Sequence, residues 1–268
     1  MRIIIKYIDA NYLINNVNEA FDTWKKSAWH KNVDFLHFCR YILPYKVDKE
    51  PISEWRSYLR EKYDFLIKDI TSEKEAFYIV FNHLKSNFKV KRNGYPYEKD
   101  AILLDLLGSG DCKARAIYMV YVMRSLGIAA AFDYTPYWAN YGANSHSWAV
   151  MVDNKDYVYT GRDSTENIID GTYEESKYSV EKDKYIYSID SLKKIAKVHR
   201  VNYHLSDSYH ESTNGPYLFR SPYDEDVTMY YPNITKENIV ELERFDNSEL
   251  LTYSSICRLK PLSKPDKY

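Results

Sequence analysis

Residues 108–127 read GSGDCKARAIYMVYVMRSLG, a glycine-rich loop followed by a strongly apolar segment. The apolar character of the segment after the loop predicts a helix. Gly127 stands where a residue in the left-handed conformation commonly ends a helix. We therefore expect a central helix from about Cys112 to Leu126, entered directly from the loop at Gly108 to Asp111.

Cys112 opens this helix, which makes it a candidate nucleophile. Its sulfur would lie among backbone N–H groups that have no partner within the helix, at the positive end of the helix dipole. Helix N-termini and a neighbouring imidazolium lower the pKa of a thiol from about 8.5 to roughly 3.5–7.5, and the thiolate is the reactive form. The alternative is a small buried cysteine that packs and does not react.

The first third of the chain is predicted to be mainly helical. Apolar residues recur at three- and four-residue spacing from Asn18 to about Ala28 and predict a short helix. A second helix is expected after Pro51, with Ser53 as its N-cap. Ser72, with Glu75 three residues later, forms a capping-box pattern at the start of a third.

The segment after the central helix predicts strands. Ile128 to Tyr134 is short and apolar, and His146 to Val152 and Tyr157 to Thr160 are two further strand-like runs. The polar residues 153–156 between the last two runs indicate a hairpin. Helices followed by antiparallel strands predict the α+β class.

His146 is the candidate general base, because a thiol nucleophile needs an imidazole that takes up a proton and returns it to the leaving amine. Of the seven histidines, only His146 stands inside a candidate strand. A two-residue turn at Asn154 and Lys155 would place His146 directly opposite Asp163, with the two Cβ atoms about 4.5–5.5 Å apart. A carboxylate there would fix the tautomer of the imidazole.

Two alternatives to this pairing stay open. A longer loop or a bulge would shift the register by one or two residues and place Gly161 or Arg162 opposite the histidine. Separately from the register, the alternative interpretation of His146 is a satisfied core histidine, and that of Asp163 is a surface carboxylate.

Composition excludes several classes of protein. The 268 residues are 45% hydrophobic and 28% charged, as in ordinary soluble globular proteins. No apolar run approaches the roughly 18 residues that cross a bilayer, and the opening MRIIIK is too short for a secretory leader. The net charge of −1 provides no field that would attract nucleic acid or an anionic membrane. We expect no transmembrane segment and no nucleic-acid partner.

Neither a metal nor another cofactor is expected. The three cysteines are odd in number and widely separated, which argues against a disulfide framework and against a paired zinc motif. Three histidines lie close together beyond residue 198, but their spacing is poor for a metal site and no further ligand completes the set. The residues concerned are Cys39, Cys112 and Cys257, and His199, His204 and His210.

Four short segments together resemble the core of the transglutaminase-like superfamily. They are Gly110-Asp-Cys-Lys-Ala-Arg-Ala116, Arg124-Ser-Leu-Gly-Ile128, His146-Ser-Trp148 and the acid Asp163, in the family's order and spacing. The resemblance covers about Leu103 to Asp163, and residues 38–55 look like the helical region that precedes this core in large bacterial members. It implies a papain-like arrangement in which the helix that bears Cys112 packs on an antiparallel sheet that bears His146 and Asp163.

The resemblance also implies a function: acyl transfer or hydrolysis at a peptide or glutamine amide, through a thioester on Cys112. The backbone N–H of Cys112 is one oxyanion donor, and a second is not assigned. Hydrolysis, as in a peptidase or amidase, is expected over crosslinking. The alternative function is a non-catalytic module that binds peptide or glycan on the same fold. A thiol probe that labels Cys112 no faster than an ordinary thiol would favour this alternative.

Substrate contacts are expected in the loop after the first strand. Residues 133–140 look like the family's active-site loop, so Tyr137, Trp138 and Asn140 would border the groove for the acyl donor. Trp148 would lie on the same face as His146 and shield it from water, or belong to the core. The expected partner is a protein or peptide, with glycan or cell-wall peptide as further possibilities, and the resemblance implies export or association with the cell envelope.

Three regions are expected along the chain. Residues 1–95 would form a mainly helical region packed on the core, residues 96–200 the transglutaminase-like catalytic core, and residues 201–268 a C-terminal extension of unknown role.

Overall fold

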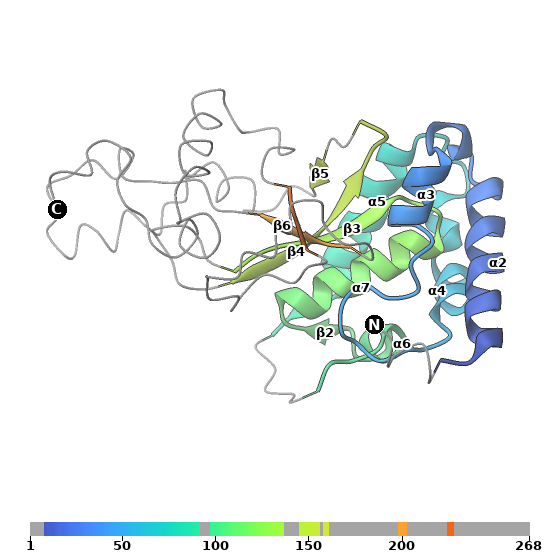
Figure 1. The fold of residues 1–268 in the computed structure, drawn as a ribbon. Coiled ribbons are helices and arrows are strands. Elements are labelled where there is room, and N and C mark those ends of the chain that lie inside the picture. The colour runs from blue at the N-terminus through green and yellow to red at the C-terminus, as the bar shows by residue number, and fades with distance from the viewer. Residues whose placement is uncertain are drawn as a thin grey trace, which may run out of the picture. The chain divides into compact units, whose positions relative to one another are not determined.

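The chain divides into two compact units, and the first of them is mainly helical. The computed structural model describes residues 8–91, 97–136, 145–155, 158–160, 198–202 and 224–227. The first unit contains residues 1–132 and 147–161, and the second contains residues 133–146 and 162–268. Together the described residues combine helices with a mainly antiparallel sheet, as the α+β prediction requires (Figure 1).

The helices of the described residues all belong to the first unit. They are α2 (Ala10–Lys26), the 3-10 helix η1 (His30–Asn32), α3 (Phe35–Tyr41), α4 (Trp55–Tyr63), the 3-10 helix η2 (Asp64–Ile67), α5 (Glu73–Asn87), α6 (Ala101–Leu107) and α7 (Cys112–Ser125).

Helix α7 is the central element of this unit. Every residue from Ala116 to Ser125 is buried, and α7 packs against α2, α4, α5 and α6. Figure 1 shows it lying among the other helices. A helix that is apolar on every side can only be stable when it is surrounded in this way. Gly127 follows with φ 76°, so both the predicted bounds of this helix and its left-handed ending are confirmed within one residue.

The predicted N-terminal helices are present, but two of their starts were wrong. Helix α2 begins at Ala10 rather than Asn18, and the Asp9 side chain caps it by accepting from the Asn11 N–H at 3.1 Å. Ser53 does not cap α4, because its Oγ makes no hydrogen bond among the described residues. The cap at Ser72 is confirmed: its Oγ accepts from the backbone N–H of Glu75 at 3.4 Å.

Two buried arginines fasten the chain between α3 and α4 to the helices. Arg56 donates to the carbonyls of Ile42, Leu43 and Pro44, at 2.7 to 3.2 Å. Arg124, near the end of α7, donates to the carbonyls of Tyr41, Lys46 and Ala130, at 2.9 to 3.1 Å. Because a guanidinium offers five donors in a fixed plane, each arginine can hold several carbonyls at once. The loop at residues 42–50 is therefore fixed along α7.

Strand pairing is described for each unit in turn. In the first, β4 (His146–Val152) pairs antiparallel with β5 (Val158–Thr160), and the Val152 N–H donates to the carbonyl of Ala129, just before β3 (Ala130–Thr135). In the second, the end of β3 pairs antiparallel with β6 (His199–Val201), and β6 pairs antiparallel with β7 (Asp224–Asp226). The hydrogen-bonded order is β5-β4-β3-β6-β7.

A buried ion pair supports the pairing of β3 with β6. The Arg200 guanidinium donates to both oxygens of Asp133, at 2.8 and 2.9 Å. Both side chains are almost fully buried, with exposed fractions of 1% and 0%. A buried charge is tolerated only when it is paired in this manner.

The turn between β4 and β5 differs from the prediction. Val152 pairs with Val158, so the connection has five residues, 153–157, and the register is displaced by one residue from that of a two-residue turn. Asn154 explains the difference: its side chain donates to the carbonyl of Asn32 and accepts from the Asp34 N–H. These bonds hold the connection against the chain between η1 and α3. The pairing argument for Asp163 is therefore wrong in its register.

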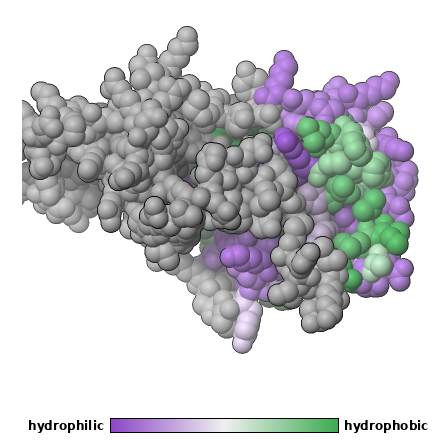
Figure 2. Space-filling model, viewed as in Figure 1, coloured by the Kyte–Doolittle hydropathy of each residue, from purple (hydrophilic) through white to green (hydrophobic). Residues whose placement is uncertain are grey.

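Hydrophobic side chains also reach the surface on α2 and α3. The exposed fractions are 56% for Ile14, 60% for Phe35 and 57% for Leu36, and Figure 2 shows hydrophobic residues gathered on the side where α3 lies. Apolar atoms form much of any protein surface, so this area does not by itself indicate a binding site. Within the described ranges, every helix is too short or too polar to cross a bilayer.

The buried carboxyl of Glu73 should make the stability of the fold depend on pH. Burial raises the pKa of its carboxyl from 4.5 to about 7, the bond from the Ala129 N–H opposes the rise, and the charge of Asp153 adds to it. Between these values the folded protein keeps this proton and the unfolded chain loses it. We therefore expect the free energy of unfolding to fall by about 1–3 kcal/mol as pH rises through this window.

Urea unfolding between pH 4.5 and 8 measures this effect in wild type and in Glu73→Gln. The glutamine amide does not titrate, so the variant should lose this part of the pH dependence. Glu75→Gln, on the exposed side of the same turn, should retain it. Parallel pH profiles for wild type and Glu73→Gln would contradict the assignment.

Candidate active site

Cys112 is the first residue of α7, as predicted. It is partly exposed and its thiol is free, while the helix behind it is buried. The Asp111 side chain caps the helix by accepting from the Ala114 N–H at 2.8 Å. The sulfur therefore belongs to the one accessible end of a buried helix, beside backbone N–H groups that carry partial positive charge.

The approach to Cys112 is held by a short parallel strand pair. β1 (Lys89–Val90) pairs with β2 (Ser109–Gly110), and the Lys89 and Lys91 N–H groups donate to the carbonyls of Gly108 and Gly110 at 2.8 and 2.7 Å. Gly108 takes the left-handed conformation, with φ 53°, which ends α6. The loop that precedes Cys112 is therefore held at both Gly108 and Gly110 by these hydrogen bonds.

Gly110 is required by a close approach rather than by its dihedral angles. A Cβ built on it would lie 2.6 Å from the Ala114 Cβ and 3.3 Å from the Phe88 ring. Only a residue without a side chain allows the loop to pass this close to the first turn of α7. The position of Cys112 therefore depends on a glycine two residues earlier.

Lys113 joins two segments of the chain to the same helical turn. Its ammonium lies 2.8 Å from the Asp48 carboxylate and 2.7 Å from that of Glu98. Asp48 comes from the loop fixed by the buried arginines, and its backbone N–H donates to Glu50. The turn that carries the thiol is consequently surrounded by ordered polar groups.

His146 is the first residue of β4 and is partly exposed, while the strand beyond Ser147 is buried. An exposed start on a buried strand suits a side chain that must meet a substrate. Trp148 has an exposed fraction of 3%, which favours its interpretation as a core residue over that of a substrate contact.

Several predicted site residues lie outside the described ranges. Asp163, Tyr137, Trp138 and Asn140 are among them, so their roles stay predictions. Cys112 belongs to the first unit and His146 to the second.

The histidine cluster gains no support as a metal site. His199 is buried in β6, with its ring centroid 5.5 Å from that of Tyr134, and His204 and His210 lie outside the described residues. Among the residues that the structure describes, no three His, Cys, Asp or Glu side chains gather in an arrangement that could hold a metal ion.

Comparison with known proteins finds a family model that matches part of the chain. Residues 60–161 match the model of the transglutaminase-like superfamily, a range that runs from α4 through α7 to the end of β5. This segment, which is less than half of the chain, is therefore similar to the transglutaminase-like superfamily. Its helices and antiparallel sheet, preceded by a helical N-terminal region, form a transglutaminase-like fold. No curated protein sequence matches the chain.

Two solved structures share a distant likeness to this chain. One is a proposed cysteine protease from Cytophaga hutchinsonii, with 12% identity, a TM-score of 0.34, and coverage of 40% of this chain and 38% of that one. The other is a proposed protease from Parabacteroides distasonis, with 11% identity, a TM-score of 0.34, and coverage of 70% of this chain and 28% of that one. The matched parts span less than two fifths of either protein.

Gly110→Ala tests the close packing behind the nucleophile. The added methyl group must displace Ala114 or Phe88, so we expect the free energy of unfolding to drop by about 1–3 kcal/mol. Urea denaturation measures it. Ser109→Ala, one residue earlier in β2, is the control and should change stability by less than about 0.5 kcal/mol. Equal midpoints for Gly110→Ala and wild type would disprove the close approach.

Proposed function

We propose that the protein is a thiol-dependent enzyme that hydrolyses an amide or transfers its acyl group. Cys112 is the nucleophile, His146 the general base and acid, and Asp163 the residue that orients His146. The observation that carries this proposal is the place of Cys112: a partly exposed free thiol at the N-terminus of a buried helix, within the segment that matches the superfamily.

The chemistry follows from these roles. The Cys112 thiolate attacks the amide carbonyl carbon, and the carbonyl oxygen takes the negative charge of a tetrahedral intermediate. The His146 imidazolium, formed when it accepted the thiol proton, then gives that proton to the leaving amine. The C–N bond breaks and a thioester remains on Cys112. Water or a second amine, deprotonated by His146, attacks the thioester and restores the thiol.

The surroundings of Cys112 suit the charge changes of this reaction. Its backbone N–H at the start of α7 is one donor for the developing oxyanion, and no reorganisation is needed because the helix is fixed. The Asp111 cap and the Lys113 bridge restrict the first turn of the helix. Preorganised donors of this kind are a large part of the rate enhancement of acyl-transfer enzymes.

The assignment of Asp163 is supported by the family resemblance alone, since the register of β4 and β5 does not support the pairing argument. The same resemblance supports Tyr137, Trp138 and Asn140 as the border of the acyl-donor groove. It also supports water over an amine as the usual acceptor, which would make the protein a peptidase or amidase that acts on proteins or peptides.

Alkylation of the cysteines tests the nucleophile and the base. Iodoacetamide is added at pH 7, and the rate at each thiol is followed by peptide mass spectrometry. Cys39 is an internal control, because burial raises the pKa of its thiol. We expect Cys112 to react at least about tenfold faster than an ordinary thiol, because a helix N-terminus and a neighbouring imidazolium favour the reactive thiolate form of a cysteine.

Two variants complete this experiment. His146→Ala should remove most of the excess rate at Cys112, whereas His83→Ala, at a partly exposed histidine of α5, should leave it unchanged. If Cys112 reacts no faster than a model thiol and is indifferent to His146→Ala, the catalytic proposal fails. A non-catalytic binding module on the same fold would then be the better description.

A further inference from the structure

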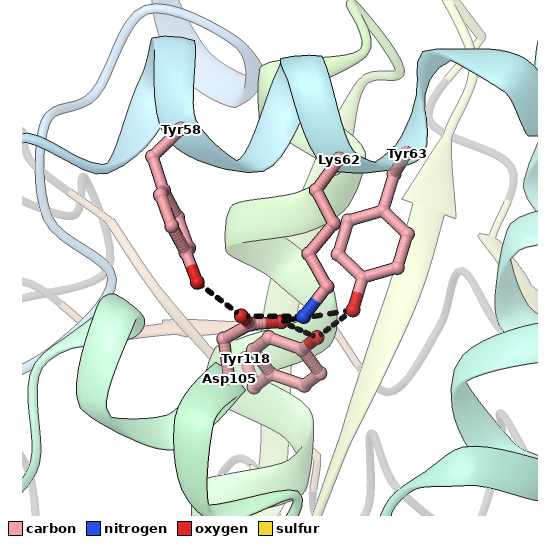
Figure 3. A network of polar contacts seen from close by, with 5 residues as sticks. All are labelled: Tyr58, Lys62, Tyr63, Asp105 and Tyr118. Atoms are coloured by element: carbon pink, nitrogen blue, oxygen red, sulfur yellow. Dashed lines mark hydrogen bonds and ion pairs between the residues drawn. The ribbon is translucent and has the colours of Figure 1, made fainter.

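Asp105 is a buried carboxylate that the proposed reaction does not use. It lies on α6, seven residues before Cys112, and none of its side chain is exposed. Four side chains donate to it, all at 2.7 to 2.9 Å, as Figure 3 shows. Three come from α4 and one from α7: Tyr58, Lys62 and Tyr63, and Tyr118.

The carboxylate of Asp105 has several hydrogen-bond donors and stays ionised. Burial alone would raise the pKa of Asp105, but the bonds from Lys62 and the three tyrosines outweigh it and hold that pKa below its ordinary value. Burial, with the bonds to Tyr63 and Asp105, raises the pKa of Tyr118. The carboxylate therefore remains an acceptor and the phenols remain donors across the physiological range.

The network joins the two helices on either side of the loop that precedes the nucleophile. Asp105 precedes the loop at residues 108–111, and Tyr118 follows it, two turns into α7. The bond between them, at 2.7 Å, ties the end of α6 to the body of α7. Helix α4 holds both partners, because Tyr63 donates to Asp105 at 2.8 Å and its hydroxyl lies 2.6 Å from that of Tyr118.

A second route leads from Tyr118 to the same loop. The Tyr118 ring stacks on Phe88, with centroids 5.4 Å apart. Phe88 is the residue against which Gly110 packs, and it immediately precedes β1, which pairs with β2. Phe88 therefore links the Tyr118 ring to Gly110, which is two residues before Cys112.

We propose that Asp105 is a positioning residue for Cys112. It sets the angle between α6 and α7 through Tyr118, and so fixes the first turn of α7, where the thiol and its backbone N–H must meet the substrate. The expected effect of Asp105 on the reactivity of Cys112 rests on the proposed function. Its expected effect on the order of the first turn of α7 does not.

The matched pair Tyr118→Phe and Tyr58→Phe tests the proposal. Each variant removes one hydroxyl that donates to Asp105, but only Tyr118 lies on the helix that begins with Cys112. The readout is hydrogen exchange at the Ala114 and Arg115 amides, which donate to the side chain and carbonyl of Asp111. Thermal unfolding midpoints, measured in parallel, correct for the overall loss of stability.

We expect Tyr118→Phe and Asp105→Asn to speed exchange at these two amides by about tenfold, and Tyr58→Phe to speed it by less than about twofold. Alkylation of Cys112 by iodoacetamide should also slow several-fold in the first two variants and not in Tyr58→Phe. If Asp105→Asn does not fold, the two Phe variants carry the test, because each loses a single oxygen atom.

Two results would overturn the positioning role. One is exchange at Ala114 and Arg115 that rises equally in Tyr118→Phe and Tyr58→Phe, in proportion to the loss of thermal stability. The other is a reactive wild-type Cys112 whose alkylation rate is unchanged in Tyr118→Phe and Asp105→Asn. An unreactive Cys112 in the wild type would instead refute the proposed function, and the exchange measurements would still decide the role of Asp105.

Discussion

The rest of the structure depends on the burial of α7. A helix whose residues from Ala116 to Ser125 are all buried must be covered on every side, and four other helices provide that cover. Its first turn is the part that remains accessible, and this is where the sequence places Cys112. The same hydrophobic constraint that organises the core thus presents one thiol at the surface, at the helix terminus that best stabilises negative charge.

Polar side chains along α7 determine how the surrounding helices and loops are arranged. Lys113 pairs with Asp48 and Glu98, Tyr118 donates to Asp105, Tyr121 donates to Glu50, and Arg124 donates to three carbonyls. Each joins the helix to another segment of the chain. Tyr118, Tyr121 and Arg124 are buried, and each would be costly without its partner, so these contacts favour a single arrangement of the surrounding chain.

The sequence predicts the elements whose signals are local. The bounds of α7, the left-handed Gly127 and the limits of β4 follow from unbroken apolar runs and a glycine. The start of α2 was missed because its first turns bury the polar Asn16, which donates to the carbonyl of Leu43. The register of β4 and β5 was missed because Asn154 binds chain 120 residues away. Long-range bonds of this kind leave no local pattern.

The residues of the candidate site also differ in how far local sequence patterns predict them. Cys112 and His146 could be placed because one begins a helix and the other begins a strand, whereas Asp163 depended on the geometry of a turn. Asp105 carries no sequence signal at all: a single acid in an apolar helix becomes informative only when Tyr58, Lys62, Tyr63 and Tyr118 are seen to converge on it.

A crystal structure of the free protein tests the central claim most directly. The quantity to measure is the distance from Cys112 Sγ to the nearer ring nitrogen of His146. The account predicts a separation of about 3–4 Å, with the other ring nitrogen within hydrogen-bond reach of a carboxylate oxygen of Asp163. A His146 ring turned away from both the thiol and that acid would contradict it.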